Sequence, residues 1–224
     1  MLCNVMDLGG YGIDASDGTI GHVEDFYFDD QTWAIRYLVA ATGGWVGSRN
    51  VLISPISIGI PDQGRKLLPV AISKEQVRMS PAVDTDKPVS LQHEKEARLR
   101  DDDPHLRSCN AVSGYHVHAS DGEIGHVEGL LVDDETWAIL YLIVNTSNWW
   151  VGHKVLIATD WIQDVSWFDS MVSINAPRQA VKDAPAYDSA KPLDRQQEMR
   201  LYMHYGKVGY WAGAEIVETD IVRI

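Results

Sequence analysis

The sequence contains few cysteines, no long apolar run and no run of basic residues. A membrane-spanning helix needs roughly 20 consecutive apolar residues, and no stretch approaches that length, so we expect no transmembrane segment. The first residues lack the basic stretch and apolar core of a secretion signal. The two cysteines, Cys3 and Cys109, favour a reduced pair over a disulfide between them. Together these absences predict a cytoplasmic protein.

Positive charge is also scarce. The chain has 19 Lys and Arg residues against 32 Asp and Glu residues, which gives a formal net charge of -13. Phosphate backbones attract basic surfaces, so nucleic acid is not an expected partner. The same sign of charge disfavours unassisted binding to an anionic membrane surface.

An internal repeat is the main feature that the sequence does contain. At a shift of 104 residues, positions 11–38 lie over positions 115–142 without a gap, and both share Ala-Ser-Asp-Gly, Ile-Gly-His-Val-Glu and Thr-Trp-Ala-Ile. The match resumes at a Val-Leu-Ile string and continues to a Lys-Pro pair in each half. Chance does not produce such agreement over this length. The repeat predicts two domains, residues 1–104 and 105–224.

Each copy has the pattern of a small all-β unit. The Asp-Gly pairs at 17–18 and 121–122 are strong hairpin signals, because glycine accepts a positive φ. Short runs rich in β-branched and aromatic residues follow, and residues 33–40 are nearly continuously apolar. Five or six short strands within about 70 residues favour a small antiparallel barrel. The predicted fold class is therefore mainly β, with two tandem small antiparallel barrels.

A short helical arm is predicted after each barrel. Prolines bracket an acidic linker, and Ser90 and Asp194 are suitable N-cap residues for helices over 91–100 and up to about residue 204. We expect the arms, residues 73–100 and 177–205, to pack on the barrel of the other copy or on another subunit.

The repeated string Tyr-x-x-x-Ala-Ser-Asp-Gly-x-Ile-Gly-His-Val-Glu, followed by Asp-Asp-x-Thr-Trp-Ala-Ile-x-Tyr-Leu, resembles the PRC-barrel family. This family includes the cytoplasmic part of the photosynthetic reaction-centre H subunit and the C-terminal half of RimM-type ribosome maturation factors. The structural motif lies at equivalent positions in the two copies: Asp17, Gly18, Gly21, Asp29 and Trp33, and Asp121, Gly122, Gly125, Asp133 and Trp137.

The resemblance implies tandem PRC barrels, as in free-standing bacterial proteins, and a role in docking to other proteins. Similarity to the H subunit implies a second hypothesis, an accessory role in the photosynthetic light reactions or in respiratory electron transfer. That role would require peripheral association with a membrane complex, since the H subunit's spanning helix has no counterpart here. The resemblance carries over no catalytic residue.

Catalytic groups are not predicted from the residues either. The sequence has no Gly-x-Ser-x-Gly nucleophile elbow and no phosphate loop ending in Gly-Lys-Ser/Thr, so we predict no enzyme and no cofactor. A metal protein or enzyme is the third hypothesis. His116 and His118 lie two apart on a predicted strand and so share a face, and a third ligand such as Asp121 or Glu123 would be required. Two surface histidines on an edge strand are the simpler interpretation.

The aspartate pairs at 29–30 and 133–134 recur in both copies. A loop this short supplies too few oxygens for Ca²⁺ without help from elsewhere. Aspartate side chains accept hydrogen bonds from nearby backbone amides, so turn formation explains these pairs better.

Tryptophan is unevenly distributed between the copies. Trp33 and Trp137 are equivalent, as are Trp45 and Trp150, and we expect such pairs to fill the core. The second copy is richer in tryptophan, and the candidates for a protein interface are Trp149, Trp150, Trp161, Trp167 and Trp211. The leading hypothesis is a non-catalytic protein-binding or assembly module that forms a homo-oligomer and binds a protein of unknown identity.

Overall fold

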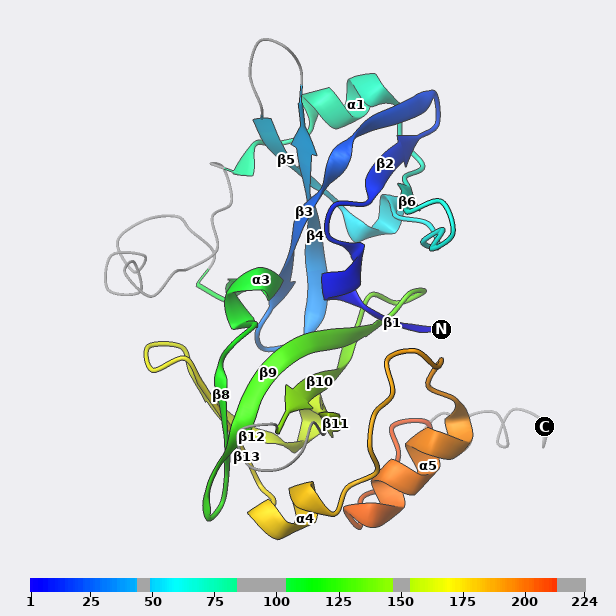
Figure 1. Ribbon diagram of the computed structural model, residues 1–224. Coiled ribbons are helices and arrows are strands. Elements are labelled where there is room, and N and C mark those ends of the chain that lie inside the picture. Colours follow the sequence, from blue (N-terminus) through cyan, green and yellow to red (C-terminus); the bar gives the residue numbers. More distant parts are fainter. Residues whose placement is uncertain (44–48, 84–103, 147–153, 213–224) are drawn as a thin grey trace, which may run out of the picture.

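A computed structural model describes residues 1–43, 49–83, 104–146 and 154–212 of the chain. The chain is mainly β and contains two sheets, one in each half of the sequence (Figure 1). This agrees with the predicted fold class. Among these residues, no helix combines the length and the apolar character that crossing a membrane requires.

The first sheet has the strand order β5-β4-β3-β2-β6. Its strands are antiparallel except for β6, which lies parallel to β2. A short 3-10 helix, η2 (Pro55–Ser57), follows β5, and α1 (Lys74–Met79) follows β6. The strands are β2 (Gly12–Ala15), β3 (Gly18–Asp29), β4 (Ala34–Thr42), β5 (Arg49–Ile53) and β6 (Leu67–Pro69).

The second sheet repeats this arrangement in the order β11-β10-β9-β8-β13-β12, again with one parallel pair, β13 beside β8. The 3-10 helix η4 (Thr159–Trp161) follows β11, and α4 (Arg178–Lys182) and α5 (Arg195–His204) follow the last strand. The strands are β8 (His116–Ala119), β9 (Gly122–Asp133), β10 (Ile139–Asn145), β11 (Lys154–Ala158), β12 (Ile162–Ser166) and β13 (Met171–Ile174).

Neither sheet closes on itself within the described ranges. The first path ends at β5 and β6, and the second ends at β11 and β12. The expected closed barrels are therefore not seen here, although two barrel-like, strongly curved sheets are consistent with the predicted class. Long central strands let each sheet curve, because β3 and β9 both contain register shifts where they pair with their neighbours.

Equivalent hydrogen bonds recur in the two halves at the sequence shift of 104. The hairpin aspartate of each half, Asp17 or Asp121, accepts a 2.7 Å hydrogen bond from the first backbone amide of the following helix, α1 or α4. The serine amide just before this aspartate donates to the backbone near the helix start, at 3.0 Å in both halves. These aspartates therefore join the hairpin to the helix, a role beyond the turn that the sequence indicated.

Gly21 and Gly125 permit the same close approach of backbones in both halves. Both have positive φ, 64° and 144° respectively. An added Cβ would lie 2.1 Å from the carbonyl oxygen of Ala41 in the first case and 2.0 Å from that of Asn145 in the second. Only glycine fits where the long strand crosses so close to its neighbour.

The two halves exchange their first strands. The strand β1 (Leu2–Asn4) pairs with the far end of β9, and β7 (Leu106–Ser108) pairs with the far end of β3. The registers are equivalent: Cys3 lies opposite Val132, and Arg107 lies opposite Phe28. Figure 1 shows β1, next to the N-terminus, running beside β9 of the other half. Each sheet is thus completed by a strand from the opposite half.

One hydrophobic core joins the two halves. Its largest cluster of buried residues includes Phe28 of the first half and Val132 of the second, both fully buried. Phe26 stacks on Trp137 across the boundary, with ring centroids 5.6 Å apart. The short 3-10 helix η1 (Val5–Leu8) and helix α3 (Cys109–Val112), which follow the exchanged strands, also contribute buried residues to this core.

The structure describes the second helical arm and, of the first, residues 73–83 with α1. Helix α5 begins after Asp194, whose side chain forms a capping box with Gln197, as the sequence predicts. Tyr202 of α5 packs edge-on against Trp161, with centroids 5.0 Å apart. Because Trp161 belongs to the same half, α5 does not pack on the other copy as expected. Helix α5 instead packs on aromatic side chains of its own half, such as Trp161. Residues 187 and 189–193 of the same arm, however, line a pocket together with Met1–Asn4, Leu8, Tyr11 and Gln63 of the first half, so the expectation holds in part. The first predicted helix, residues 91–100, lies outside the described residues.

Candidate functional site

The junction between the halves is built around Trp33 and Trp137. Both have positive φ, 52° and 58°, which is unusual for a bulky residue. The carbonyl of Trp137 accepts a 2.9 Å hydrogen bond from the amide of Ile35, and the carbonyl of Trp33 accepts one of 2.7 Å from Ile139. These reciprocal bonds indicate a local twofold relation. The hydrogen bonds to the opposite half maintain the strained backbone conformation of the two tryptophans.

A buried ion pair fixes the exchanged strand β7 to the first half. The guanidinium of Arg107 donates to Asp30 through Nε, at 2.7 Å, and both side chains are only 8% exposed. His105 Nδ1 contacts the other oxygen of Asp30, at 2.9 Å. The Arg107 guanidinium also lies 4.4 Å from the ring centroid of Trp167, in a cation–π contact. Arg107 thus connects both halves to the β12–β13 hairpin.

The second aspartate of each pair contacts the opposite half. The backbone amide of Asp30 donates to His105 at 3.0 Å, and that of Asp134 donates to Met1 at 3.1 Å. The buried carboxylate of Asp134 also accepts a hydrogen bond from the Met1 amino group. The interpretation of Asp30 and Asp134 as turn residues is therefore incomplete, because their side chains bind the exchanged strands.

The first aspartate of each pair does form the turn. Asp29 Oδ1 accepts hydrogen bonds from the amide of Gln31 and from the amide and hydroxyl of Thr32, at 2.9–3.0 Å. Burial alone raises the pKa of Asp29, but these hydrogen bonds outweigh it, so the pKa lies below its ordinary value. The pKa of Asp133 is lowered in the same way by its bonds to Thr136. The turn prediction is confirmed at these two positions.

The exchange is asymmetric at one further position. Asp25 of β3 accepts hydrogen bonds from the Ser108 hydroxyl and, at 3.1 Å, from the Asn110 amide. Burial is the main cause that raises the pKa of Asp25. The equivalent residue of β9 is Gly129, where an added Cβ would lie 2.6 Å from Asn4 Oδ1. The space that the Asp25 carboxylate fills in the first half is therefore filled in the second half by the side chain of Asn4, which lies beside Gly129.

A cleft of about 400 Å³ opens between the two halves beside the ion pair. Residues 162–165 of β12 line one side, and the Asp30 turn and the segment from His105 to Arg107 line the other. Trp33 and Trp167 are both half-buried at its borders. The lining residues are Asp30, Gln31, Trp33, His105, Arg107, Ile162, Gln163, Asp164, Val165 and Trp167.

The hairpin between β12 and β13 extends the cleft with an exposed aromatic side chain. Phe168 at its tip is 71% exposed, and the hairpin projects from the body of the molecule (yellow, at left in Figure 1). Trp167 beside it packs on Phe28 and Tyr115, with centroids 6.4 and 6.1 Å away. The tip is therefore anchored to the core by one aromatic residue while the next faces solvent.

The other tryptophan candidates have different surroundings. Trp161 is buried at 8% exposure beneath α5. Trp211 is half-buried, and its ring lies 4.5 Å from the Arg195 guanidinium. Trp149 and Trp150, like Trp45, lie outside the described residues. A role for these tryptophans in binding a partner stays a prediction, with Trp167 the one beside a cleft.

A buried carboxylate attaches α5 to the second sheet. Glu198 is 4% exposed and accepts hydrogen bonds from the hydroxyls of Tyr141, at 2.7 Å, and Tyr210, at 3.0 Å. It also pairs with Arg195 at 2.9 Å. Burial, followed by the bond to Glu198, raises the pKa of Tyr141 well above its ordinary value, so this phenol remains a donor. Glu198 and its three partners bind one another, so we assign them a structural role in holding α5 on the sheet.

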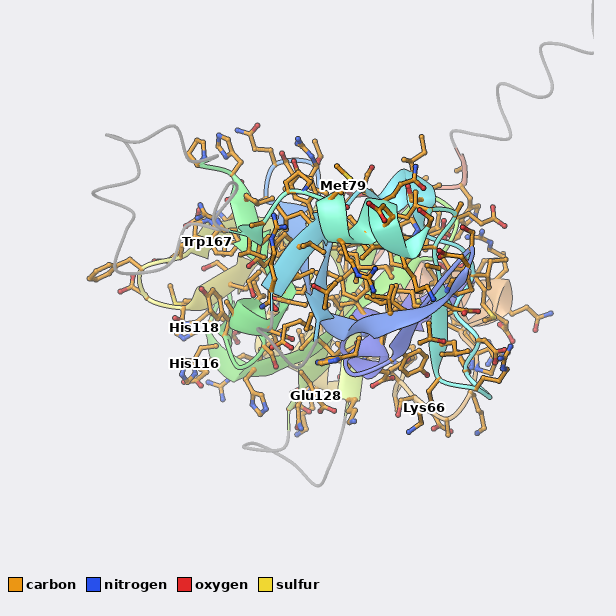
Figure 2. All side chains as sticks on the ribbon, turned by 90° about the horizontal axis from the view of Figure 1, so that it is seen from above. Lys66, Met79, His116, His118, Glu128 and Trp167 are labelled. Atoms are coloured by element: carbon orange, nitrogen blue, oxygen red, sulfur yellow. The ribbon has the colours of Figure 1, made fainter. Side chains whose placement is uncertain are left out.

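His116 and His118 do share one face of β8, on either side of the buried Val117. Figure 2 labels both at one side of the molecule. However, His116 Nδ1 contacts Glu123 at 2.8 Å, and the Asp121 carboxylate already accepts the hydrogen bond from α4. Within the described ranges, no three His, Cys, Asp or Glu side chains are placed so as to hold a metal ion.

Both cysteines are buried free thiols. Burial raises the pKa of Cys3 to about 12 and that of Cys109 well above its ordinary value. A thiol reacts as its thiolate, so neither residue is activated as a nucleophile.

Sequence reasoning missed the two parts of this site that matter most: the exchanged strands and the Asp30–Arg107 pair. The repeat itself offered a signal, since Leu2 aligns with Leu106 at the same shift of 104. The pairing of a strand with the opposite half has no local signature. Phe168 was also overlooked, because no turn was predicted around it.

Comparison with known proteins supports the fold in the first half. No curated protein matches this chain. The model of the PRC-barrel domain family matches residues 13–77, which run from β2 through α1 and include all strands of the first sheet except the exchanged one. The chain therefore contains a PRC-barrel domain at residues 13–77.

Proposed function

We propose that this chain is a non-catalytic protein-binding module in which two PRC-type copies form a pseudo-dimer. The second copy would comprise the sheet from β8 to β13, which has the strand order and hydrogen bonds of the first at a shift of 104. The PRC-barrel domain in the first half supports a role in protein interaction or assembly. The partner would bind at the cleft between the halves and at the adjoining hairpin.

The observation that carries this proposal is the grouping of Trp33, Trp167 and Arg107 around one cleft, with Phe168 exposed beside it. Tryptophan and arginine are the side chains that most often supply binding energy at protein interfaces. The Asp30–Arg107 pair keeps this wall in place before any partner binds, which lowers the entropic cost of association.

The proposal also includes self-association of the chain, but through a surface other than the exchanged strands. The exchange of β1 and β7 supplies, within one chain, an interface of the kind that the sequence led us to expect between chains. Contacts between whole chains would therefore use other surfaces, such as the hairpin tip. A solution mass from light scattering measures this directly.

A pull-down from native lysate tests the proposal. Full-length protein should capture a partner, and Phe168→Ser should reduce that capture several-fold. Met79→Ser is the matched control, because Met79 is also exposed, at 76%, but lies on α1 away from the hairpin (Figure 2). Equal capture by both variants, or no partner together with a monomeric mass, would argue against the proposed surface.

A further inference from the structure

The strand β12 presents an open edge to the cleft. It is the last strand of its sheet and pairs, among the described elements, with β13 alone. Residues 162–165 of this strand line the cleft. An edge strand offers unpaired backbone N–H and C=O groups, which are a template for a further strand.

The size of the cleft fits an extended segment. Five residues of β12 span about 16 Å at roughly 3.3 Å per residue. The cleft volume of about 400 Å³ falls within the range of preformed ligand sites. Alternate side chains of an added strand would meet the opposite wall, where Gln31 and Trp33 lie.

The charges in the cleft indicate which segment would bind. The positive charge of Arg107 is neutralised by Asp30, at 2.7 Å. The Asp164 side chain is exposed, and its carboxylate forms no hydrogen bond or ion pair with any other residue that the structure describes. A free carboxylate in the cleft, on a chain with a net charge of -13, favours a cationic segment and speeds its approach.

We propose that the cleft binds an extended, basic segment of a partner protein, which adds to the edge of β12 as a further strand. Backbone hydrogen bonds to β12 would provide affinity, and contact of a Lys or Arg side chain with Asp164 would provide selectivity. This inference rests on the proposed function and specifies the recognition mode of the same site.

Synthetic peptides test this mode with the full-length protein. The probe is a fluorescein-labelled peptide of four Lys-Val repeats, and the matched peptide has four Glu-Val repeats. Fluorescence polarisation should show binding of the Lys-Val peptide alone. Asp164→Lys should weaken that binding at least tenfold, since Asp164 is the one carboxylate without an ion pair among the described residues that line the cleft. Asp160→Lys is the control, because Asp160 is exposed on η4 but does not line the cleft.

Hydrogen exchange separates strand addition from contact through side chains. Bound Lys-Val peptide should slow amide exchange in residues 162–166. Every second backbone amide of the peptide can be N-methylated, on either the lysines or the valines. One of these two peptides should lose binding, because only one of the two sets of amides would bond to β12. Equal binding by Asp164→Lys and the unmodified protein, or protection elsewhere than β12, would overturn the inference.

The two proposals fail in different ways. Partner capture that depends on Phe168, without peptide protection of β12, would remove the strand-addition mode and leave the proposed function standing. Loss of both results would remove the cleft as a binding site altogether.

Discussion

The Asp30–Arg107 pair allows a quantitative test of how the two halves are joined. Both side chains are 8% exposed, and the Nε–Oδ2 distance is 2.7 Å. Replacing Asp30 by alanine removes this carboxylate from the buried guanidinium. Removal of one partner from a buried pair typically costs about 3–5 kcal/mol of unfolding free energy. We expect Asp30→Ala to cost an amount in this range.

Urea unfolding at neutral pH measures this cost, and a nearby exposed pair provides the comparison. Arg36 and Asp29 lie 3.3 Å apart, with the Arg36 side chain 48% exposed. Arg36→Ala should cost about 1 kcal/mol or less, as solvent screens exposed pairs. The double variant Asp30→Ala, Arg107→Met should lose much less than the sum of its single variants, because both charges of the buried pair are then removed together. A cost for Asp30→Ala as small as that for Arg36→Ala would refute the reasoning.

Four further predictions concern the packing and titration of single residues. Gly125→Ala should destabilise the protein by several kcal/mol through its clash with a backbone carbonyl, whereas Gly114→Ala, at φ 91° with nothing within 4 Å, should cost only about 1–2 kcal/mol in thermal or urea unfolding; equal losses would contradict the clash. Asp133→Asn should lose stability at neutral pH, and the difference from the unmodified protein should close as pH falls through the lowered pKa, below about 3.9. Asp25→Asn should show the opposite trend, since the raised pKa of Asp25 gives stability that is fully present below about 3.9 and is lost as pH rises through the folded pKa; parallel pH curves for the two variants would disprove these signs. Cys109 should resist alkylation at pH 8 until urea unfolds the chain, and rapid labelling of native protein would contradict its burial.

Local signals in the sequence predicted local structure well. The hairpins at Asp17-Gly18 and Asp121-Gly122 and the start of α5 after Asp194 all depend on residues within a few positions of one another. Turn formation by Asp29 is equally local, since its carboxylate accepts hydrogen bonds from Gln31 and Thr32, two and three residues further along the chain.

Contacts between distant segments were not predictable in the same way. The strands β1 and β7 have three residues each, too few for a period-two pattern, and each pairs with a strand of the opposite half. In the Asp-Asp pairs both residues look alike in sequence, yet Asp29 faces its own turn and Asp30 faces Arg107. Which of two neighbouring carboxylates reaches across the boundary depends on the fold alone.

Fusion of the two copies into one chain explains how a symmetric framework can carry an asymmetric site. A homodimer would present the same hairpin twice, whereas here Trp167 and Phe168 stand where the first half has Gln63 and Gly64. Likewise Arg107 occupies the position of Cys3 on the exchanged strand. The backbone pairing that holds the halves together is preserved on both sides of the junction, while side chains at equivalent positions have diverged. Under the proposed function, the first half would contribute Asp30, Gln31 and Trp33 to the cleft, and the second half would add Arg107 and Trp167, which have no counterpart of the same type in the first.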